Sequence, residues 1–253
     1  MSKNNDLEIC HTPEDVAQKA TQEFVRLANA VIARGQVFAV ALSGGSTPKR
    51  LYQLLAEEKG NGFPEAWKKI HLFFGDERHV PPDHAESNFR MVKEALLSHI
   101  DMLAENIHRI TAENPDANAA AIDYEREMKS FFTKTNKMAD GFPVFDLILL
   151  GMGPDGHTAS LFPGSAGLEE KLRWIISNPV EKFKTDRITL TYPVLNHAAN
   201  ILFLICGEDK AAMIGEVLGT KADATVYPVQ RVKPVHGTKR WLLDKAAAKE
   251  LKN

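Results

Sequence analysis

Short apolar runs alternate along the chain with longer segments in which apolar residues recur at helical spacing. Thr12-Pro13, a cap residue followed by proline at the first helical position, opens one such segment, and Gly35 ends it. Continuous apolar runs such as Val37–Leu42 are typical of strands buried on both faces. The pattern predicts strands over residues 37–42, 70–74, 146–150 and 201–206. It predicts further helices over 48–59, 87–99 and 209–218, and one after Asn114-Pro115-Asp116.

This alternation of strands and helices predicts a mainly parallel sheet that is covered by helices on both faces. The sequence holds no linker-like stretch, no repeat at a solenoid period and no low-complexity tract. We therefore expect a single α/β domain over residues 1–253, with a doubly wound, Rossmann-like sheet.

The composition excludes several classes of protein. Lys and Arg number 31 against 33 Asp and Glu, so the chain lacks the cationic excess of a nucleic-acid binder. Its apolar runs fall far short of the ~20 residues that span a bilayer, and its N-terminus lacks the apolar core of a secretory signal. With 2 cysteines and no obvious apolar seam, we expect a cytoplasmic monomer without a disulfide framework.

Ligands of such sheets bind outside the carboxyl ends of the strands, so we expect the functional residues in the loops that follow the expected strands. The first loop places two glycines and three hydroxyl-bearing residues before a helix: Ser43, Gly44, Gly45, Ser46 and Thr47. Backbone N–H groups, hydroxyls and a helix N-terminus suit a phosphate. The loop is not a P-loop, because the Gly-Lys-Ser/Thr ending is absent. A plain strand–helix turn with a hydroxyl cap explains these residues equally well.

A cluster of charged residues follows the next strand, at Gly75–His79. Asp76, Arg78 and the glutamate between them are costly to hold together at a strand end without partners or a function. An internal Asp–Arg ion pair is the alternative explanation. A metal site built from the nearby histidines is disfavoured, because a Pro-Pro pair interrupts them and they lack the i, i+4 spacing of ligands on a helix.

The third loop, Gly151–His157, matches the G-x-G-x-x-G pattern of dinucleotide-binding turns. Two features argue against a dinucleotide. No Asp or Glu occurs over residues 175–178, where a ribose-binding carboxylate is expected. In addition, Asp155 and His157 place an acid and an imidazole in the turn itself. Most isolated loop histidines are surface residues, but an Asp-x-His pair among glycines favours a positioned general base.

Two basic residues stand near other strand ends. Arg187 opens the strand-like segment Arg187–Thr191, and Lys210 lies just after the strand that ends at Cys206. Taken singly, each is typical of a solvated surface charge. Together with the Ser43–Thr47 loop, they are placed to converge on one phosphate.

With these motifs, the sequence resembles the 6-phosphogluconolactonase family. Three segments carry the resemblance, in order and at similar spacing: Leu42–Pro48, Gly75–Arg78 with Ser87-Asn88, and Gly151–Pro163. Trp241–Ala248 also resembles the family's C-terminal segment. The related glucosamine-6-phosphate deaminases share the fold and a Gly-x-Gly-x-Asp-Gly-His loop. They continue to Asn-Glu-Pro where this chain has Leu161-Phe162-Pro163, and they have an Asp-Glu-Tyr type of loop where this chain has Gly-Asp-Glu-Arg. Both differences favour the lactonase.

The resemblance implies hydrolysis of 6-phospho-D-glucono-1,5-lactone in the oxidative pentose phosphate pathway, with no metal and no organic cofactor. His157 is then the general base that activates water at C1, a role that suits an imidazole near neutral pH. Asp155 or Asp76 orients the imidazole or the sugar hydroxyls, and the sequence does not separate these roles. Arg78 is expected to meet the negative charge of the substrate or the developing oxyanion. The other candidates are expected to hold the 6-phosphate: Ser43, Gly44, Gly45, Ser46, Thr47, Arg187 and Lys210.

Alternatives of two other kinds stay open. A deaminase or aldose–ketose converter of the same fold would act on an amino or keto sugar phosphate, and the missing Glu after His157 argues against it. A non-catalytic sugar-phosphate sensor would carry a DNA-binding segment, whereas one expected helix precedes the first expected strand. A scaffold protein would leave the charged residues at the strand ends unexplained.

Overall fold

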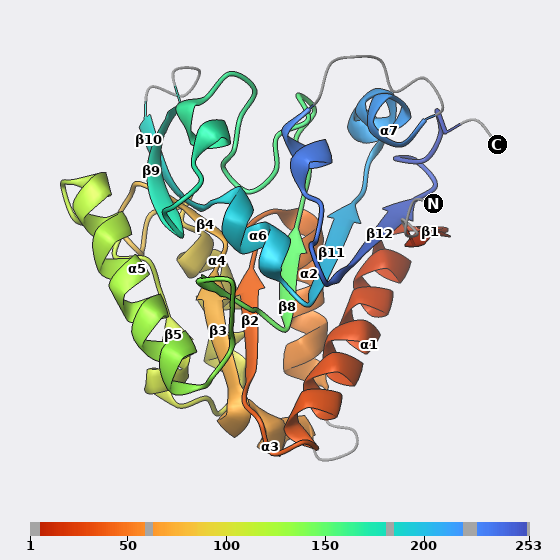
Figure 1. Cartoon of the computed structure of the whole chain (residues 1–253). Helices are drawn as coiled ribbons and strands as arrows, with labels where there is room; N and C mark the ends of the chain where they lie inside the picture. Colours follow the sequence, from red (N-terminus) through yellow and green to blue (C-terminus); the bar gives the residue numbers. More distant parts are fainter. Residues whose placement is uncertain (1–5, 59–62, 181–184, 220–226, 252–253) are drawn as a thin grey trace.

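A seven-stranded parallel sheet forms the centre of the computed structural model, which describes residues 6–58, 63–180, 185–219 and 227–251 (Figure 1). The strand order is β1-β12-β11-β8-β2-β3-β5, and every pairing is parallel. The strands are β1 (Asp6–Cys10), β2 (Phe38–Leu42), β3 (Ile70–Phe74), β5 (Ile107–His108), β8 (Leu147–Leu150), β11 (Asn200–Ile205) and β12 (Thr238–Asp244).

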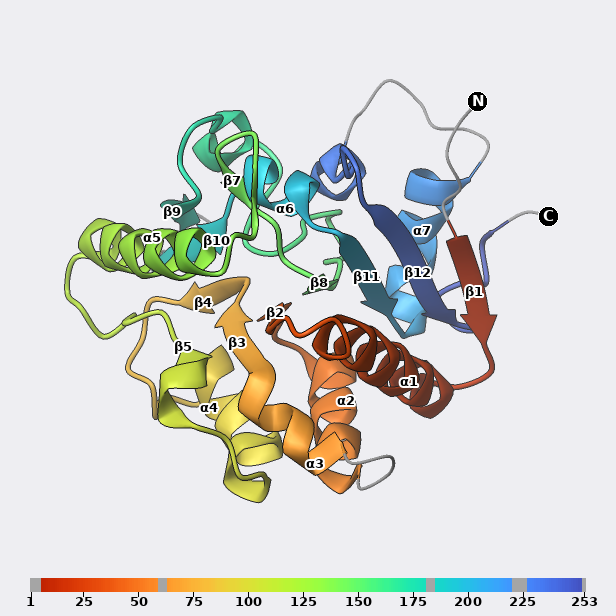
Figure 2. The ribbon, with the colours of Figure 1, turned by 60° about the horizontal axis from the view of Figure 1, so that its bottom comes forward.

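Helices cover both faces of this sheet. Figure 2 shows α1, α2 and α4 on one side and α5 and α6 on the other. The helices are α1 (Pro13–Ile32), α2 (Ser46–Glu57), α3 (Phe63–Ala66), α4 (Asn88–Ala95), α5 (Ala117–Lys134), α6 (Tyr192–His197) and α7 (Ala211–Leu218). The prediction of a doubly wound α/β sheet is therefore confirmed.

A second, antiparallel sheet stands beside the carboxyl edge of the first. Its order is β4-β10-β9, from β4 (Asp76–Arg78), β10 (Thr185–Leu190) and β9 (Ile175–Val180). The expectation of a loop over Gly75–His79 was wrong for Asp76–Arg78, because three charged residues show no strand pattern and their pairing partner lies far along the chain. The strand expected to open at Arg187 begins two residues earlier, at Thr185. A small hairpin, β6 (Met138–Ala139) with β7 (Phe142–Pro143), precedes β8.

The sequence pattern missed both strands at one edge of the large sheet. β1 comes before the helix that was expected to be the first element. β12 lies between β1 and β11 and pairs with both. Leu7 and Ile9 of β1 are exposed, so this strand lacks the continuous apolar run of a buried one. The helix expected over 48–59 begins at Ser46, and its expected last residue, Lys59, lies outside the described residues. The helix expected over 87–99 ends at Ala95 and is followed by a short 3₁₀ turn.

Aromatic residues fill the space between the sheet and α5. The Phe73 ring of β3 stacks on His108 at 4.1 Å between centroids and meets Phe145 edge-on at 5.3 Å. A buried ion pair lies close by, where Lys137 donates to Asp146 at 2.8 Å and Ala39 N–H donates to the same carboxylate. These contacts hold the amino end of β8 against β2 and pack β3 against the aromatic side chains beneath α5.

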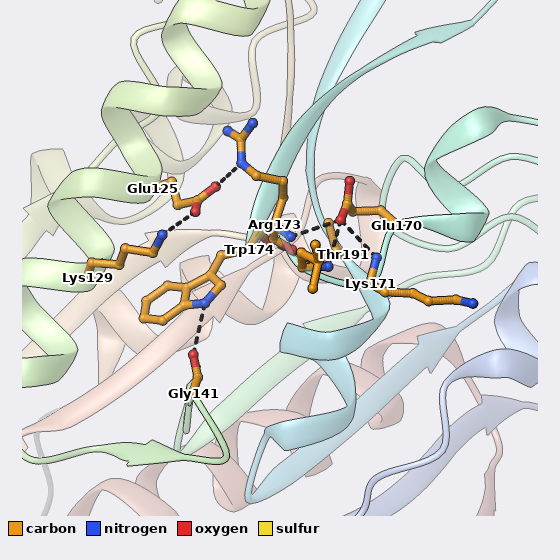
Figure 3. A network of polar contacts seen from close by, with 9 residues as sticks. Glu125, Lys129, Gly141, Glu170, Lys171, Arg173, Trp174 and Thr191 are labelled. Carbon is orange, nitrogen blue, oxygen red and sulfur yellow. Dashed lines mark hydrogen bonds and ion pairs between the residues drawn. The ribbon is translucent and has the colours of Figure 1, made fainter.

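A buried carboxylate ties α5 to the chain that leads into β9 (Figure 3). Glu125 is 6% exposed and accepts hydrogen bonds from Lys129 Nζ at 2.5 Å and Arg173 Nε at 2.6 Å. Next to it, the Trp174 indole N–H donates to the carbonyl of Gly141 at 3.2 Å. This network therefore joins the helix, the segment before β9 and the hairpin β6–β7.

The same network reaches the end of β10. Thr191 Oγ1, directly after β10, donates to the carbonyl of Arg173 at 2.6 Å. The Glu170 carboxylate accepts the backbone N–H groups of the next three residues at 2.7 to 2.9 Å, which shapes the turn before β9 (Figure 3). The end of β10 is thus tied to the segment that leads into β9.

We predict that Glu125→Gln lowers the free energy of unfolding near pH 7 by about 1–3 kcal/mol, because charge-assisted hydrogen bonds are lost. Burial raises the pKa of Glu125, but Lys129 and Arg173 outweigh burial and leave the pKa below its usual value. A carboxyl group whose pKa is lower in the folded chain than in the unfolded chain stabilises the fold at pH values above its unfolded pKa of about 4.3. This stabilisation is lost as the pH falls through the folded pKa. Urea unfolding across pH measures the difference between variant and wild type.

Glu57→Gln is the matched control, because Glu57 lies on the surface with a side chain that is 68% exposed. It should change stability little at any pH. If Glu125→Gln lowers the free energy of unfolding by the same amount at acid pH, where the carboxyl is protonated, as at pH 7, then the ionised carboxylate is not what stabilises the fold.

Candidate active site

A cleft of about 370 Å³ opens at the carboxyl edge of the large sheet. Its walls come from the loops after β2, β8 and β11 and from strands β4 and β10. Every candidate residue identified from the sequence lines this cleft except Asp155, which contacts His157 instead. The candidates in the lining are Ser43, Gly44, Gly45, Ser46, Thr47, Asp76, Arg78, His157, Arg187 and Lys210.

An imidazole and a carboxylate form a close pair in the turn after β8. His157 Nδ1 lies 2.5 Å from Asp155 Oδ1, and the same oxygen accepts the backbone N–H of His157 at 3.3 Å. Burial alone would raise the pKa of Asp155, but the hydrogen bond and charge of His157 outweigh it and hold the pKa of this carboxyl below its usual range. An ionised carboxylate only accepts, so Nδ1 donates, and the lone pair of a neutral ring lies on Nε2.

Glycines let this turn close around the imidazole. A methyl group at Gly153 would lie 2.1 Å from Cε1 and Nδ1 of His157, so a side chain at that position would displace the ring. Gly156 has a φ of +76°, the left-handed region that favours glycine. The ring of Phe162 stacks on His157 at 4.2 Å between centroids. Of the glycines that resemble a dinucleotide motif, Gly153 therefore allows close packing against the histidine, and Gly156 allows the left-handed turn before it.

Asp76 occupies a different wall of the cleft from the Asp155–His157 pair. It is buried, and its Oδ2 accepts a hydrogen bond from Ser160 Oγ at 2.6 Å. Ser160 is held in turn, because its N–H donates to Thr189 Oγ1 at 3.1 Å and its carbonyl accepts from Asn178 Nδ2 at 2.8 Å. Of the two carboxylates that the sequence left open, Asp155 is the one in contact with the imidazole.

Sequence reasoning missed the residues that support Asp76. Thr189 and Asn178 come from β10 and β9, where they follow a strand pattern without any chemical motif. Ser160 lies within the segment that carries the family resemblance, which was the one available signal. Asn88 also reaches the site, because its Nδ2 donates to the carbonyl of Asp76 at 2.9 Å and it packs against Gly44.

The glutamate between Asp76 and Arg78 has a structural role. Glu77 is 2% exposed, and it accepts the N–H groups of Asn88 and Phe89 at 2.7 and 2.8 Å at the start of α4. Burial raises the pKa of Glu77 despite these hydrogen bonds. Asp76 and Arg78 both lie in the described part of the chain and form no ion pair with each other. An internal Asp–Arg ion pair therefore does not explain the cluster.

Two arginines stand directly opposite each other in the cleft wall. Arg78 of β4 pairs in register with Arg187 of β10. Burial first, and the charge of Arg78 next, lower the pKa of Arg187 from its usual value. Like charges directly opposite each other destabilise a strand pair, and the nearby carboxylates of Asp76, Glu86 and Glu77 act against the lowering of the Arg187 pKa. An anion in the cleft would relieve this repulsion.

The glycine loop supplies donors on another side of the cleft. Gly45 caps α2 with a φ of +108°, and no side chain fills the cap position, which leaves backbone N–H groups of the first turn for a ligand. The Tyr52 hydroxyl fixes the backbone of Ser43 by bonding both its N–H and its carbonyl. The Ser43 Oγ is buried in the cleft lining with no hydrogen-bond partner among the described atoms.

The segment after β11 completes the lining. Lys210 is the cap residue of α7, and its Nζ lies 2.9 Å from Asp209 Oδ2. Cys206 also faces the cleft, and burial raises the pKa of its thiol to about 11. A protonated thiol is a poor nucleophile near neutral pH, so the imidazole is the better candidate for catalysis.

Two features are absent from the described part of the chain. No group of three or more His, Cys, Asp or Glu side chains there lies close enough together to hold a metal ion. None of the helices in that part is long and apolar enough to cross a membrane.

The chain is similar to known proteins over most of its length. The family model described as glucosamine-6-phosphate isomerases/6-phosphogluconolactonase matches residues 11–241. A 6-phosphogluconolactonase of Nostoc sp. is 40% identical over 236 residues, which cover 93% of each chain. The structure of 6-phosphogluconolactonase from Trypanosoma cruzi superposes with a TM-score of 0.87 at 30% identity, covering 100% of this chain and 99% of that one.

A monomeric glucosamine-6-phosphate deaminase has the same fold, with a TM-score of 0.77 at 19% identity over 97% of this chain and 99% of its own. At that identity the likeness concerns the fold alone. The match of the family model over most of the length carries the conclusion: the chain belongs to the glucosamine-6-phosphate isomerase/6-phosphogluconolactonase family.

Proposed function

We propose that this protein hydrolyses 6-phospho-D-glucono-1,5-lactone to 6-phospho-D-gluconate, a step of the oxidative pentose phosphate pathway. The observation that carries the proposal is the Asp155–His157 pair, which holds an imidazole at a cleft lined by Arg78, Arg187 and Lys210. The relatives of 37 to 42% identity that are named 6-phosphogluconolactonase support it.

In the proposed mechanism, His157 Nε2 takes a proton from a water molecule as the water oxygen attacks C1 of the lactone. The C1 carbonyl becomes an oxyanion, and the bond between C1 and the ring oxygen then breaks. The imidazolium returns its proton to the ring oxygen, which leaves as the C5 hydroxyl. Asp155 keeps Nδ1 protonated and stabilises the imidazolium. The balance is one lactone and one water to one carboxylic acid, which ionises in solution.

The cationic residues have two tasks in this proposal. Arg78 stabilises the oxyanion that develops at C1 or the charge of the substrate. The Ser43–Thr47 loop, Arg187 and Lys210 bind the 6-phosphate and so place C1 near His157. Asp76, fixed by Ser160, accepts a hydrogen bond from a sugar hydroxyl. A phosphate with two negative charges is the anion that such a set of donors suits best.

We predict that His157→Ala lowers kcat by about 10²–10⁴-fold, the usual contribution of a positioned general base. The assay couples freshly generated lactone to the oxidation of 6-phosphogluconate and subtracts spontaneous hydrolysis. His79→Ala is the matched control, because His79 bonds the carbonyl of Asn114 and does not line the cleft. Near-normal turnover in His157→Ala would overturn the assignment of the base, and ammonia release from glucosamine 6-phosphate by the wild type would favour a deaminase.

We predict that Arg187→Ala raises KM for the phosphorylated lactone by about 10–100-fold, because charge-assisted hydrogen bonds to a phosphate are lost. Hydrolysis of unphosphorylated glucono-1,5-lactone at high concentration should change little. Arg126→Ala is the control, because the side chain of Arg126 is 73% exposed on the surface of α5 and does not line the cleft. A KM that is unchanged for the phosphorylated lactone would contradict the phosphate role of Arg187.

A further inference from the structure

A short segment after α7 packs directly against the turn that carries His157. It comprises Tyr227 and the 3₁₀ helix η8 (Pro228–Arg231). The Val229 N–H donates to the carbonyl of Gly156 at 3.0 Å. A methyl group added at Gly156 would lie 2.8 Å from Cδ1 and 2.9 Å from Cβ of Tyr227, so the aromatic side chain presses on the glycine backbone.

Gly156 is the residue between the two members of the catalytic pair. Its left-handed backbone, with a φ of +76°, turns the chain so that the carboxylate of Asp155 and the ring of His157 meet. The contact with Tyr227 closes one side of this turn, and the bond from Val229 fixes its carbonyl. The geometry of the pair therefore depends on a segment some seventy residues away in the sequence.

An internal hydrogen bond and contacts with α7 and α6 hold this segment in place. Gln230 accepts the Tyr227 N–H at 2.9 Å, and its Nε2 donates to the carbonyl of Val217 in α7 at 3.3 Å. The Tyr192 hydroxyl of α6 donates to the carbonyl of Pro228 at 2.8 Å. Further along, the Arg231 guanidinium lies over the Tyr192 ring at 4.9 Å. A segment anchored in this way is a firm support and not a loose cover.

Tyr227 itself does not line the cleft. Any influence that it has on the reaction must therefore pass through the backbone of Gly156. That separates it from residues such as Phe162, which touches both His157 and the space for substrate.

We infer that Tyr227 is a positioning residue for the hydrolysis, because its ring holds the Asp155–Gly156–His157 turn in the geometry that aims Nε2 of His157 at C1 of the lactone. This inference rests on the proposed function. Misplacing a catalytic group by about 1 Å costs up to a hundredfold in rate. The 6-phosphate site lies on other elements, so substrate binding is not expected to depend on Tyr227.

Steady-state kinetics of the full chain with freshly generated lactone test the inference. Tyr227→Ala should lower kcat by about 10–100-fold while KM stays within about twofold, and Tyr227→Phe, which keeps the ring, should restore kcat. Trp67→Leu is the control for lost stability. Trp67 is 2% exposed and packs edge-on against Phe63 of α3. α3 lies at the end of the sheet opposite the cleft (Figure 1). The Trp67→Leu variant should lower Tm and leave kcat and KM unchanged.

Three results would overturn the inference: an unchanged kcat in Tyr227→Ala, a rise in KM without a fall in kcat, or a Tyr227→Phe variant as impaired as Tyr227→Ala. If Tyr227→Ala does not fold, Tyr227→Leu takes its place with the same expected split. Failure of the proposed function looks different, because wild-type protein would then show no acceleration over spontaneous hydrolysis.

Discussion

Neighbouring strands of a parallel sheet run in the same direction, so the loops that follow them emerge at one edge. In this chain the ladder pairs Ala41 of β2 with Ile148 of β8, and Leu150 of β8 with Phe203 of β11. The glycine loop, the His157 turn and the Lys210 segment therefore meet around one cleft, although long stretches of sequence separate them. The small sheet adds the two arginines from the side. The site is a consequence of strand direction more than of any single loop.

The electrostatics of the cleft are local. The chain as a whole has a formal net charge of −2, yet Arg78 and Arg187 lie directly opposite each other in the cleft wall, a placement of like charges that destabilises a strand pair. Each charge-assisted hydrogen bond to a bound anion contributes about 1.5–3 kcal/mol. Such bonds act against the cost of holding two cations close together, so a chain that is nearly neutral overall can still offer a local site for an anion. The buried carboxylate of Glu125 is a separate case, because Lys129 and Arg173 neutralise it within the fold (Figure 3).

Much of this arrangement was accessible from the sequence, and the exceptions have physical causes. Strands with continuous apolar runs, such as 146–150, were identified, whereas β1 was missed because an edge strand with Leu7 and Ile9 exposed has no such run. The loop residues of the cleft were identified because ligands gather at carboxyl ends of strands. The register that opposes Arg78 and Arg187 is a tertiary property. So is the support of the His157 turn by Tyr227, since no local pattern links Gly156 to a residue in another segment.

The central claim is that a neutral imidazole at position 157 performs the chemistry. The most direct measurement is the pH dependence of kcat/KM with freshly generated lactone, corrected for spontaneous hydrolysis, for wild type and His157→Gln. We predict that the wild-type kcat/KM falls toward acid pH, because protonation of the base removes the lone pair that accepts the proton of water, and that this acid limb is missing in the variant. A wild-type profile without an acid limb, or an identical acid limb in both proteins, would contradict the assignment.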